Sequence, residues 1–232
     1  MKHATKCAVQ RSVDRSVQRS VQRFALQVLG VFAGLSLAAM ASAQPVEGKE
    51  YSRMKVPHTV ETGKKIEVIE FFSYGCPHCS DLEQYLQTWF KTTPADVQFR
   101  RVPVMFQDRW KPLAKIYFTL DAMGEDVRLS PEVFKAVHVS GTPLYQDKVF
   151  FDWAASKGLD RAKVMDTYNS FGVDSKLKRA MVVAQEYNVQ AVPTVVVDGK
   201  FVTMSDRVGG HAAMPAAIDA LVAKARGERP KT

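Results

Sequence analysis

The chain has 232 residues, of which 46% are hydrophobic and 24% are charged, values ordinary for a globular protein of one domain or of one domain with an insertion. Its net charge of +8 does not indicate a nucleic-acid-binding protein, because six of the 32 Lys and Arg residues, against a single acidic residue, lie within residues 1–43. The remaining 26 basic and 23 acidic residues leave a net charge of only +3.

The N-terminus has the features of a secretory signal peptide. A basic segment precedes an apolar run at about residues 28–40, which is followed by an A-x-A cleavage site at residues 41–43. This run is too short for a comfortable membrane span, although a retained membrane anchor is the alternative. Cleavage removes Cys7, so that Cys76 and Cys79 are the only cysteines of the mature chain.

The mature chain begins with strand patterns. Residues 50–56 are a candidate first strand, and a polar connection follows them. Residues 66–72, Ile-Glu-Val-Ile-Glu-Phe-Phe, are apolar on both alternating faces apart from Glu67 and Glu70. This pattern is typical of a central strand that is covered on both sides, as in α/β sheets.

From Cys76 onward the apolar residues recur at steps of three and four. The positions that predict an amphipathic helix ending near residue 91 are Cys79, Leu82, Leu86 and Trp89. Pro77 lies one residue inside the helix start, where a missing N–H costs nothing, and Gly75 gives the preceding turn backbone freedom. We therefore expect Cys76 to cap the helix and to be partly exposed, with Cys79 one turn further and more buried.

The motif Cys76-Pro77-His78-Cys79 at this strand-to-helix junction predicts a thiol–disulfide redox centre. The unpaired N–H groups and the dipole of the helix start favour a thiolate, so we expect a lowered pKa for Cys76. His78 adds a cationic or hydrogen-bonding partner. Stabilising the thiolate stabilises the reduced form, which makes the disulfide a stronger oxidant. We therefore predict an oxidant rather than a reductant.

Half of a metal site or a structural disulfide are the alternative interpretations of this motif. A zinc site needs two further Cys or His ligands at suitable spacing, and the sequence has no second C-x-x-C and no H-x3-H. His58, His138 and His211 are isolated, so we assign no metal ligand. Glycine-rich nucleotide motifs are also absent from the sequence, and we predict no cofactor besides the redox-active disulfide of Cys76 and Cys79.

Glu70 is the candidate for a proton-transfer role. It shares the strand parity of Ile66 and Val68, so its side chain should point into a covered face. A buried carboxylate without a partner is costly and keeps its proton, with a raised pKa. Because Glu70 lies six residues before Cys76, it can accept or relay the proton of Cys79. The alternative is a partly exposed side chain at the end of the sheet.

Two other acidic residues near the motif receive weaker assignments. We expect Glu67 to be solvated or paired. Glu83 lies one turn beyond Cys79, and we predict a position on the helix surface from which it has at most an electrostatic influence on the cysteines.

The rest of the chain contains a strand at residues 97–102, which would close a β-α-β unit, and then a series of helices. We expect these helices, with Asp160 and Asp174 as N-caps, at residues 113–123, 131–139, 146–157, 160–171 and 174–187. A strand at 192–197 follows, and Asp198-Gly199 predicts a hairpin turn into a return strand at 200–203. A last helix is expected at about 212–225.

The Cys-Pro-His-Cys motif, the Glu-Phe-Phe-Ser before it and Val-Pro-Thr at 192–194 together resemble the DsbA family of periplasmic thiol oxidases. The resemblance spans about residues 50–225. It implies an α/β chain with a thioredoxin-like fold and an inserted all-helical domain. The corresponding domains, after a cleaved signal peptide at 1–43, are thioredoxin-like parts at 44–105 and 180–232 and a helical insertion at 106–179.

The resemblance also implies roles for residues far from the cysteines. Thioredoxin-like folds place a cis-proline beside the redox pair, which assigns Pro193 to this position. The backbone of Val192 would then pair with an extended substrate segment. The family has an acid at the strand position of Glu70 and often a basic residue near the end of the next strand, for which Arg101 is the candidate.

As a function, the resemblance implies a thiol:disulfide interchange protein that donates its Cys76–Cys79 disulfide to reduced exported proteins in the periplasm through a mixed disulfide. The implied reoxidant is a DsbB-type inner-membrane partner linked to quinone, and we expect a monomer that binds no nucleic acid. The alternatives are a disulfide isomerase or reductase, and a C-x-x-C metal-binding or thiol-chaperone module. DsbC-type isomerases carry an N-terminal dimerisation domain, for which too few residues precede the first strand.

Overall fold

The computed structural model describes residues 45–229. The predicted signal peptide and Cys7 lie outside this range. Among residues 45–229, no helix combines the length and the apolar character that crossing a membrane requires.

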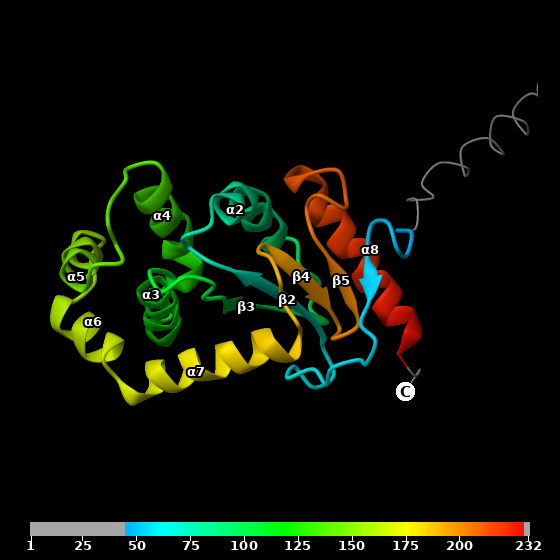
Figure 1. Ribbon diagram of the computed structural model, residues 1–232, viewed down its shortest axis with the longest axis horizontal. Helices are drawn as coiled ribbons and strands as arrows, with labels where there is room; N and C mark the ends of the chain where they lie inside the picture. Colours follow the sequence, from blue (N-terminus) through cyan, green and yellow to red (C-terminus); the bar gives the residue numbers. More distant parts are fainter. Residues whose placement is uncertain (1–44, 230–232) are drawn as a thin grey trace, which may run out of the picture. The chain divides into compact units, whose positions relative to one another are not determined.

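A five-stranded mixed sheet lies at the centre of the described part (Figure 1). In the order β1-β5-β4-β2-β3, its strands are β1 (Ser52–Arg53), β5 (Phe201–Thr203), β4 (Thr194–Val197), β2 (Ile66–Phe72) and β3 (Val97–Pro103). Strand β2 pairs in parallel with β3 and antiparallel with β4, and all seven of its residues are buried. The prediction of a central strand at 66–72 is therefore confirmed.

The first strand is shorter than the predicted range 50–56. Only two of its residues pair, Ser52 with Val202 and Arg53 with Phe201. Strand β5 offers only three residues as a partner, which limits the length of an edge strand beside it.

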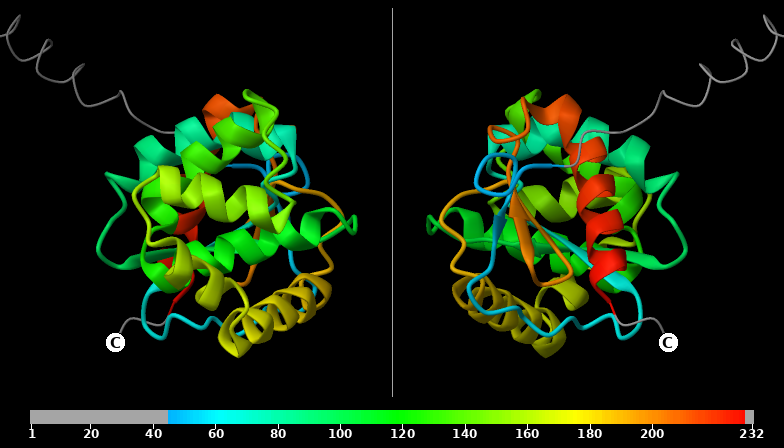
Figure 2. Two further views of the ribbon diagram at one scale, coloured as in Figure 1. Left: turned by 90° about the vertical axis from the view of Figure 1, so that its left-hand side faces the viewer. Right: turned by 90° about the vertical axis from the view of Figure 1, so that its right-hand side faces the viewer.

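Helices cover both faces of the sheet. In chain order they are α2 (Pro77–Phe90), α3 (Trp110–Met123), α4 (Asp126–His138), α5 (Asp147–Ser156), α6 (Arg161–Tyr168), α7 (Phe171–Glu186), the short 3-10 helix η1 (His211–Ala213) and α8 (Met214–Glu228). Helices α2 and α8 lie on one face and α7 on the other (Figure 1). Helices α3 to α6 gather at one end of the sheet, where they face the viewer in the left panel of Figure 2.

Two hydrophobic clusters correspond to these two faces. Ile66 and Val68 point toward α2 and α8, where they pack with side chains such as Leu82 and Ile218. The alternate residues of β2, such as Ile69, belong to the second cluster, which includes α7 and the helical end. Full burial of each such side chain contributes about 1.5–3 kcal/mol, so the apolar stripe of α2 fixes the helix that carries the cysteines.

The helix caps confirm one prediction and correct another. Asp160 caps α6, and its side chain accepts a hydrogen bond of 2.7 Å from the backbone N–H of Lys163. The predicted cap of the next helix was wrong. Ser170 caps α7, with its Oγ accepting from the N–H of Val173 at 3.2 Å, and Asp174 lies in the first turn.

Helix α7 continues without a break through residue 179, the predicted end of the inserted helical domain. Helix α7 therefore both covers one face of the sheet and forms part of the group of helices at the end of the sheet. The domain boundaries at 105/106 and 179/180 stay predictions.

Candidate active site

The two cysteines lie where β2 leads into α2, as predicted. In the connecting turn, Ser73 Oγ accepts from the N–H of Gly75 at 3.1 Å, and the carbonyl of Ser73 accepts from the N–H of Cys76 at 3.0 Å. Cys76 is the N-cap of α2, and Pro77 is its first residue. Proline suits this position because its missing N–H would have no partner inside the helix.

Both cysteines are reduced in this structure, and their exposure differs less than expected. Cys79 is fully buried, while Cys76 is 6% exposed. The order of exposure was predicted correctly, but the expectation of a partly exposed Cys76 was wrong. A segment distant in the sequence covers this side chain, since the carbonyl oxygen of Val192 lies 3.5 Å from Cys76 Sγ.

The pKa values of the two thiols are shifted in opposite directions. A hydrogen bond from Cys79 is the main cause that lowers the pKa of Cys76 to about 6, against the opposing effect of burial. The backbone N–H groups of Cys79 and His78 and the charge of His78 lower this pKa further. Burial raises the pKa of Cys79 well above its ordinary value. At neutral pH the pair is therefore a thiolate at Cys76 and a thiol at Cys79.

The predicted cis peptide bond is present between Val192 and Pro193. It immediately precedes β4, which pairs with the strand leading to the cysteines. This pairing brings the bond to Cys76 although 116 residues separate Val192 from the cysteine.

A groove of about 410 Å³ opens beside this segment. Its lining, which is more apolar than polar, consists of His78, Ala191, Val192, Pro193, Met204, Ser205, Asp206, Gly210 and His211. His211 comes from η1, and its ring lies 5.9 Å from that of His78 between centroids. No sequence pattern indicated that His211 lies near His78, because only the tertiary fold brings η1 to α2.

Glu70 is buried, as predicted, but it has a partner. Arg101 Nε donates to Glu70 Oε2 at 2.7 Å, and another nitrogen of the same guanidinium pairs with Glu83. All three side chains are nearly inaccessible to solvent. The prediction that Glu83 lies on the helix surface was therefore wrong, and the candidate basic residue Arg101 is the centre of a buried charged triad.

This triad shapes the protonation of its members. Burial raises the pKa of Glu70 to about 7, although the neighbouring Arg101 opposes the shift. The other carboxylate oxygen, Oε1, is buried without a hydrogen-bond partner. The charge of Glu70 is among the causes that raise the pKa of Cys79, so the carboxyl group acts electrostatically on the buried thiol.

Glu67 lies in a separate pair on the same strand. It is fully buried, and its Oε1 accepts from Arg100 Nε at 2.9 Å and from the backbone N–H of Glu61 at 3.2 Å. Of the two predicted environments, the paired one is correct.

Helices α3 and α4 hold the turn before Cys76. A Cβ atom on Gly75 would lie 2.5 Å from the indole nitrogen of Trp110, so close packing requires glycine here rather than the backbone freedom we expected. From α4, His138 Nε2 donates to the carbonyl of Tyr74 at 2.8 Å, and Ser130 bonds the hydroxyl of Tyr74 at 2.6 Å. The helical end thus supports the redox motif directly.

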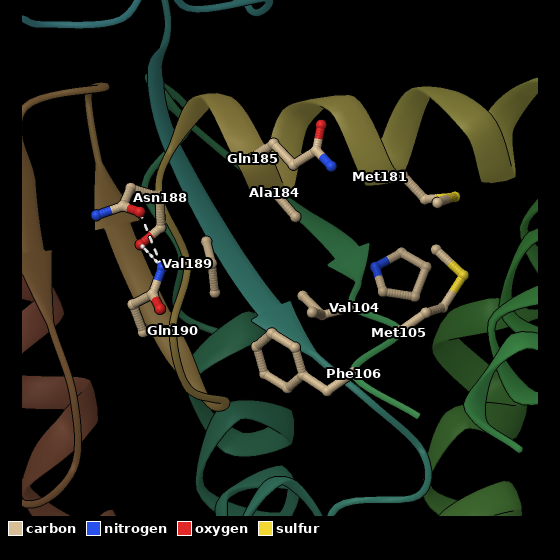
Figure 3. Close-up of a pocket in the computed structure, with 10 residues that line it drawn as sticks. Val104, Met105, Phe106, Met181, Ala184, Gln185, Asn188, Val189 and Gln190 are labelled. Carbon is tan, nitrogen blue, oxygen red and sulfur yellow. Dashed lines mark hydrogen bonds between the residues drawn. The ribbon is translucent and has the colours of Figure 1, made fainter. Parts of the chain in front are cut away.

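A second hollow, of about 310 Å³, lies between the end of β3, α7 and the segment after α7 (Figure 3). Its lining residues are Pro103, Val104, Met105, Phe106, Met181, Ala184, Gln185, Asn188, Val189 and Gln190. None of these side chains is ionisable or nucleophilic, so this hollow offers no acid, base or nucleophile for catalysis.

Comparisons with known proteins agree with this geometry. Residues 84–213 match the family described as the DSBA-like thioredoxin domain. The chain is 39% identical over 176 residues to the thiol:disulfide interchange protein DsbA of Burkholderia cepacia, covering 75% of this chain and 82% of that protein. It is 35% identical over 208 residues to the protein of the same name from Pseudomonas aeruginosa, covering 89% of this chain and 99% of that protein. An alignment of this length necessarily includes residues 76–79.

Solved structures lead to the same fold. The crystal structure of Pseudomonas aeruginosa DsbA superposes with a TM-score of 0.76 at 35% identity, covering 80% of this chain and 97% of that chain. DsbA from Xylella fastidiosa superposes with a TM-score of 0.72 at 28% identity, covering 79% of this chain and 99% of that chain. The predicted class, an α/β thioredoxin-like fold with a helical insertion, is confirmed.

Proposed function

The chain belongs to the DsbA family and is a thiol:disulfide oxidoreductase, and from this premise we propose that it oxidises exported proteins in the periplasm by donating the disulfide of Cys76 and Cys79. The observation that carries this proposal is the arrangement of the motif: Cys76 caps α2 beside the cis Val192–Pro193 bond and the groove, while Cys79 is sealed one turn further. Only one sulfur of the pair is thus placed for attack by a substrate.

In the first step of the proposed reaction, a substrate thiolate attacks Cys76 Sγ. The bond between Cys76 and Cys79 breaks, and its electron pair leaves on Cys79, which takes up a proton. Cys79 is a poor leaving group without that proton because its pKa is raised. Glu70, whose pKa of about 7 allows both protonation states near neutral pH, is the proposed source and later acceptor of this proton.

In the second step, the other substrate thiolate attacks the substrate sulfur of the mixed disulfide. Cys76 leaves as a thiolate, and the substrate departs with a disulfide and two electrons fewer, which now reside in the reduced cysteine pair. The low pKa of Cys76, to which His78 contributes, makes this sulfur a good leaving group. Pro77 keeps the helix start free of an N–H that would need a partner.

Val192 and Pro193 are the proposed substrate-binding residues. The groove beside them is mostly apolar, which suits an extended and unfolded segment of a substrate protein. Pro193 has no N–H, so it offers no donor of its own to the thiolate.

The remaining proposals concern partners and location. The relatives' names identify thiol:disulfide interchange proteins, which supports reduced exported proteins as substrates and a DsbB-type, quinone-linked membrane protein as the reoxidant. We further propose that the chain is exported by the signal peptide at residues 1–43, acts as a monomer and needs no cofactor besides its own disulfide.

The test is the redox equilibrium of the exported protein with glutathione, in the presence of EDTA, with Cys76→Ser and Cys79→Ser as controls. An oxidase is expected to have a potential clearly less negative than the glutathione pool, at about −240 mV, and neither serine variant should form the protein disulfide. A potential of about −270 mV would contradict the proposal and assign the protein to the reductases.

A further inference from the structure

Three potential metal ligands meet at the redox motif, one of them, His78, from within it, and none is a cysteine. His78 and Asp81 lie one turn apart on one face of α2, and His211 approaches them from η1. One ligand atom from each of these side chains lies within 4.8 Å of the other two. Sequence spacing cannot indicate this set, because packing of η1 against α2 creates it.

The chemistry of this set suits a borderline divalent metal ion. Two imidazoles and a carboxylate are typical ligands of Zn²⁺, whereas Mg²⁺ and Ca²⁺ prefer oxygen ligands alone. At metal–ligand distances of about 2.1 Å, tetrahedral ligand atoms lie about 3.4 Å apart. Any contraction that this requires from separations of up to 4.8 Å is available, because His78 and Asp81 are exposed.

His211 is already oriented for such a role. Its Nδ1 lies 2.8 Å from Ser205 Oγ, and when Nδ1 donates to this hydroxyl, the neutral ring presents the lone pair of Nε2. Metal-binding histidines are commonly held by a hydrogen bond of this kind through the second ring nitrogen. The loop before η1 is itself closed by a hydrogen bond of 2.7 Å from Gly210 N–H to the carbonyl of Ser205.

The negative charges around the three side chains offset the positive end of α2 and allow a cation to bind. The N-terminus of α2 is its positive end and opposes a cation nearby. Asp81 supplies a full negative charge within the set, and Asp206 lines the same groove as both histidines. These two carboxylates offset the helix end.

We propose that His78, Asp81 and His211 form a binding site for Zn²⁺ at the margin of the groove. With three protein ligands, the ion keeps a fourth position for water or another small ligand, as in open zinc sites. This site is separate from the cysteine pair and does not depend on the proposed oxidase function.

The test is a calorimetric titration of the exported protein with ZnCl2 after treatment with EDTA and with the Cys76–Cys79 disulfide closed, so that neither cysteine can bind the ion. We expect one Zn²⁺ per chain. His211→Ala and Asp81→Asn should each weaken the affinity at least tenfold. The matched controls are His58→Ala and Asp166→Asn, which remove the same groups from partly or fully exposed positions away from the groove. They should change the affinity less than twofold.

Absence of binding below millimolar Zn²⁺, or binding that both site variants leave intact, would overturn the proposal. Circular dichroism of each variant separates loss of the site from loss of the fold. As a second readout, crystals soaked in ZnCl2 should show an anomalous peak at the zinc edge among the three side chains. Because no thiol exchange occurs in these experiments, their failure leaves the dithiol oxidase proposal standing, and failure of the glutathione test leaves the zinc site standing.

Discussion

At the scale of single residues, Cys76 and Cys79 show how one helical turn separates two chemically identical groups. Hydrogen bonds from Cys79 and from the backbone at the helix start lower the pKa of Cys76. Burial and a neighbouring carboxyl group raise the pKa of Cys79. The pKa of Cys76 falls to about 6, which leaves roughly nine-tenths of it ionised at pH 7. The reactivity of the motif thus depends on position in the fold more than on residue type.

The first prediction ranks the causes of this low pKa. The rate at which iodoacetamide alkylates Cys76, measured against pH in EDTA, should give an apparent pKa of about 6. Cys79→Ala removes the main hydrogen bond and should raise this pKa more than His78→Ser does, because the His78 variant keeps its backbone N–H. A larger rise in the His78 variant would show instead that the imidazole dominates.

A second prediction concerns Glu70. Its pKa of about 7 in the folded protein exceeds the ordinary value of 4.5, so the folded state binds the proton more tightly than the unfolded state. Stability contributed by this group should therefore be lost as the pH rises from about 4.5 to about 7, by about 3 kcal/mol in total. The Glu70→Gln variant should lack this loss, so its free energy of unfolding relative to wild type should increase across this range.

Urea denaturation at several pH values measures this difference. The Asp166→Asn variant is the control, since its side chain is exposed on α6 and its substitution should leave the pH profile of wild type unchanged. A difference between Glu70→Gln and wild type that stays constant from pH 4.5 to 7.5 would contradict the raised pKa.

At the scale of elements, the charged triad joins two strands and a helix. Glu70 belongs to β2, Arg101 to the neighbouring strand β3, and Glu83 to α2. The strands pair Glu70 with Arg101 in register, so sheet formation alone places the first two charges side by side. Docking of α2 then adds the third charge.

The third prediction is that Arg101→Met destabilises the protein by about 3–5 kcal/mol at pH 7, because it leaves the buried carboxyl groups of Glu70 and Glu83 without their hydrogen-bond donor and counter-charge. Arg179→Met is the matched control. Arg179 also contacts two carboxylates, those of Glu61 and Glu186, but all three side chains are exposed, and the expected loss is below about 1 kcal/mol. If denaturant titrations show that both variants lose the same unfolding free energy, burial of the triad does not increase the cost of removing its arginine.

The same elements show what the sequence could predict. Alternation identified β2, and the three- and four-residue period identified α2, since both are signals of local burial. Glu83 was misplaced although the signal was present: it lies four residues after Cys79 and three before Leu86, on the buried face of the helix. Because glutamate is polar, we expected Glu83 to be exposed. Its partner Arg101 lies on β3, so only the tertiary fold shows that a buried arginine neutralises the charge of Glu83.

At the scale of the whole molecule, the site is assembled from distant segments. The cysteines come from the β2–α2 junction, Val192 and Pro193 precede β4, and His211 comes from η1. The motif and the family resemblance predicted the first two of these parts. The sequence pattern did not predict that His211 lies near the cysteines, because its position depends on the conformation of the loop between β5 and α8.

The fourth prediction is that the redox state of the cysteine pair changes the stability of the whole protein in a pH-dependent way. A disulfide ordinarily stabilises a folded protein by restricting the unfolded chain. Here the folded structure stabilises the thiolate that reduction produces, so the stability of the reduced protein relative to the oxidised protein should rise with pH. A folded pKa of about 6 for Cys76 contributes about 1 kcal/mol to the reduced form at pH 7. This contribution is complete above the unfolded pKa of about 8.5 and is lost as the pH falls through 6.

Denaturant unfolding of the oxidised and the reduced protein, in EDTA at pH 5, 7 and 8.5, tests this expectation. The excess stability of the reduced form should grow with pH, and Cys79→Ala, which removes the main hydrogen bond to the thiolate, should reduce the dependence of the reduced protein on pH. If the oxidised protein is the more stable form at every pH, the fold favours the disulfide, and the oxidising role loses its energetic basis. If the reduced form is more stable by an amount independent of pH, the fold disfavours the disulfide through its geometry, and the thiolate is not the cause.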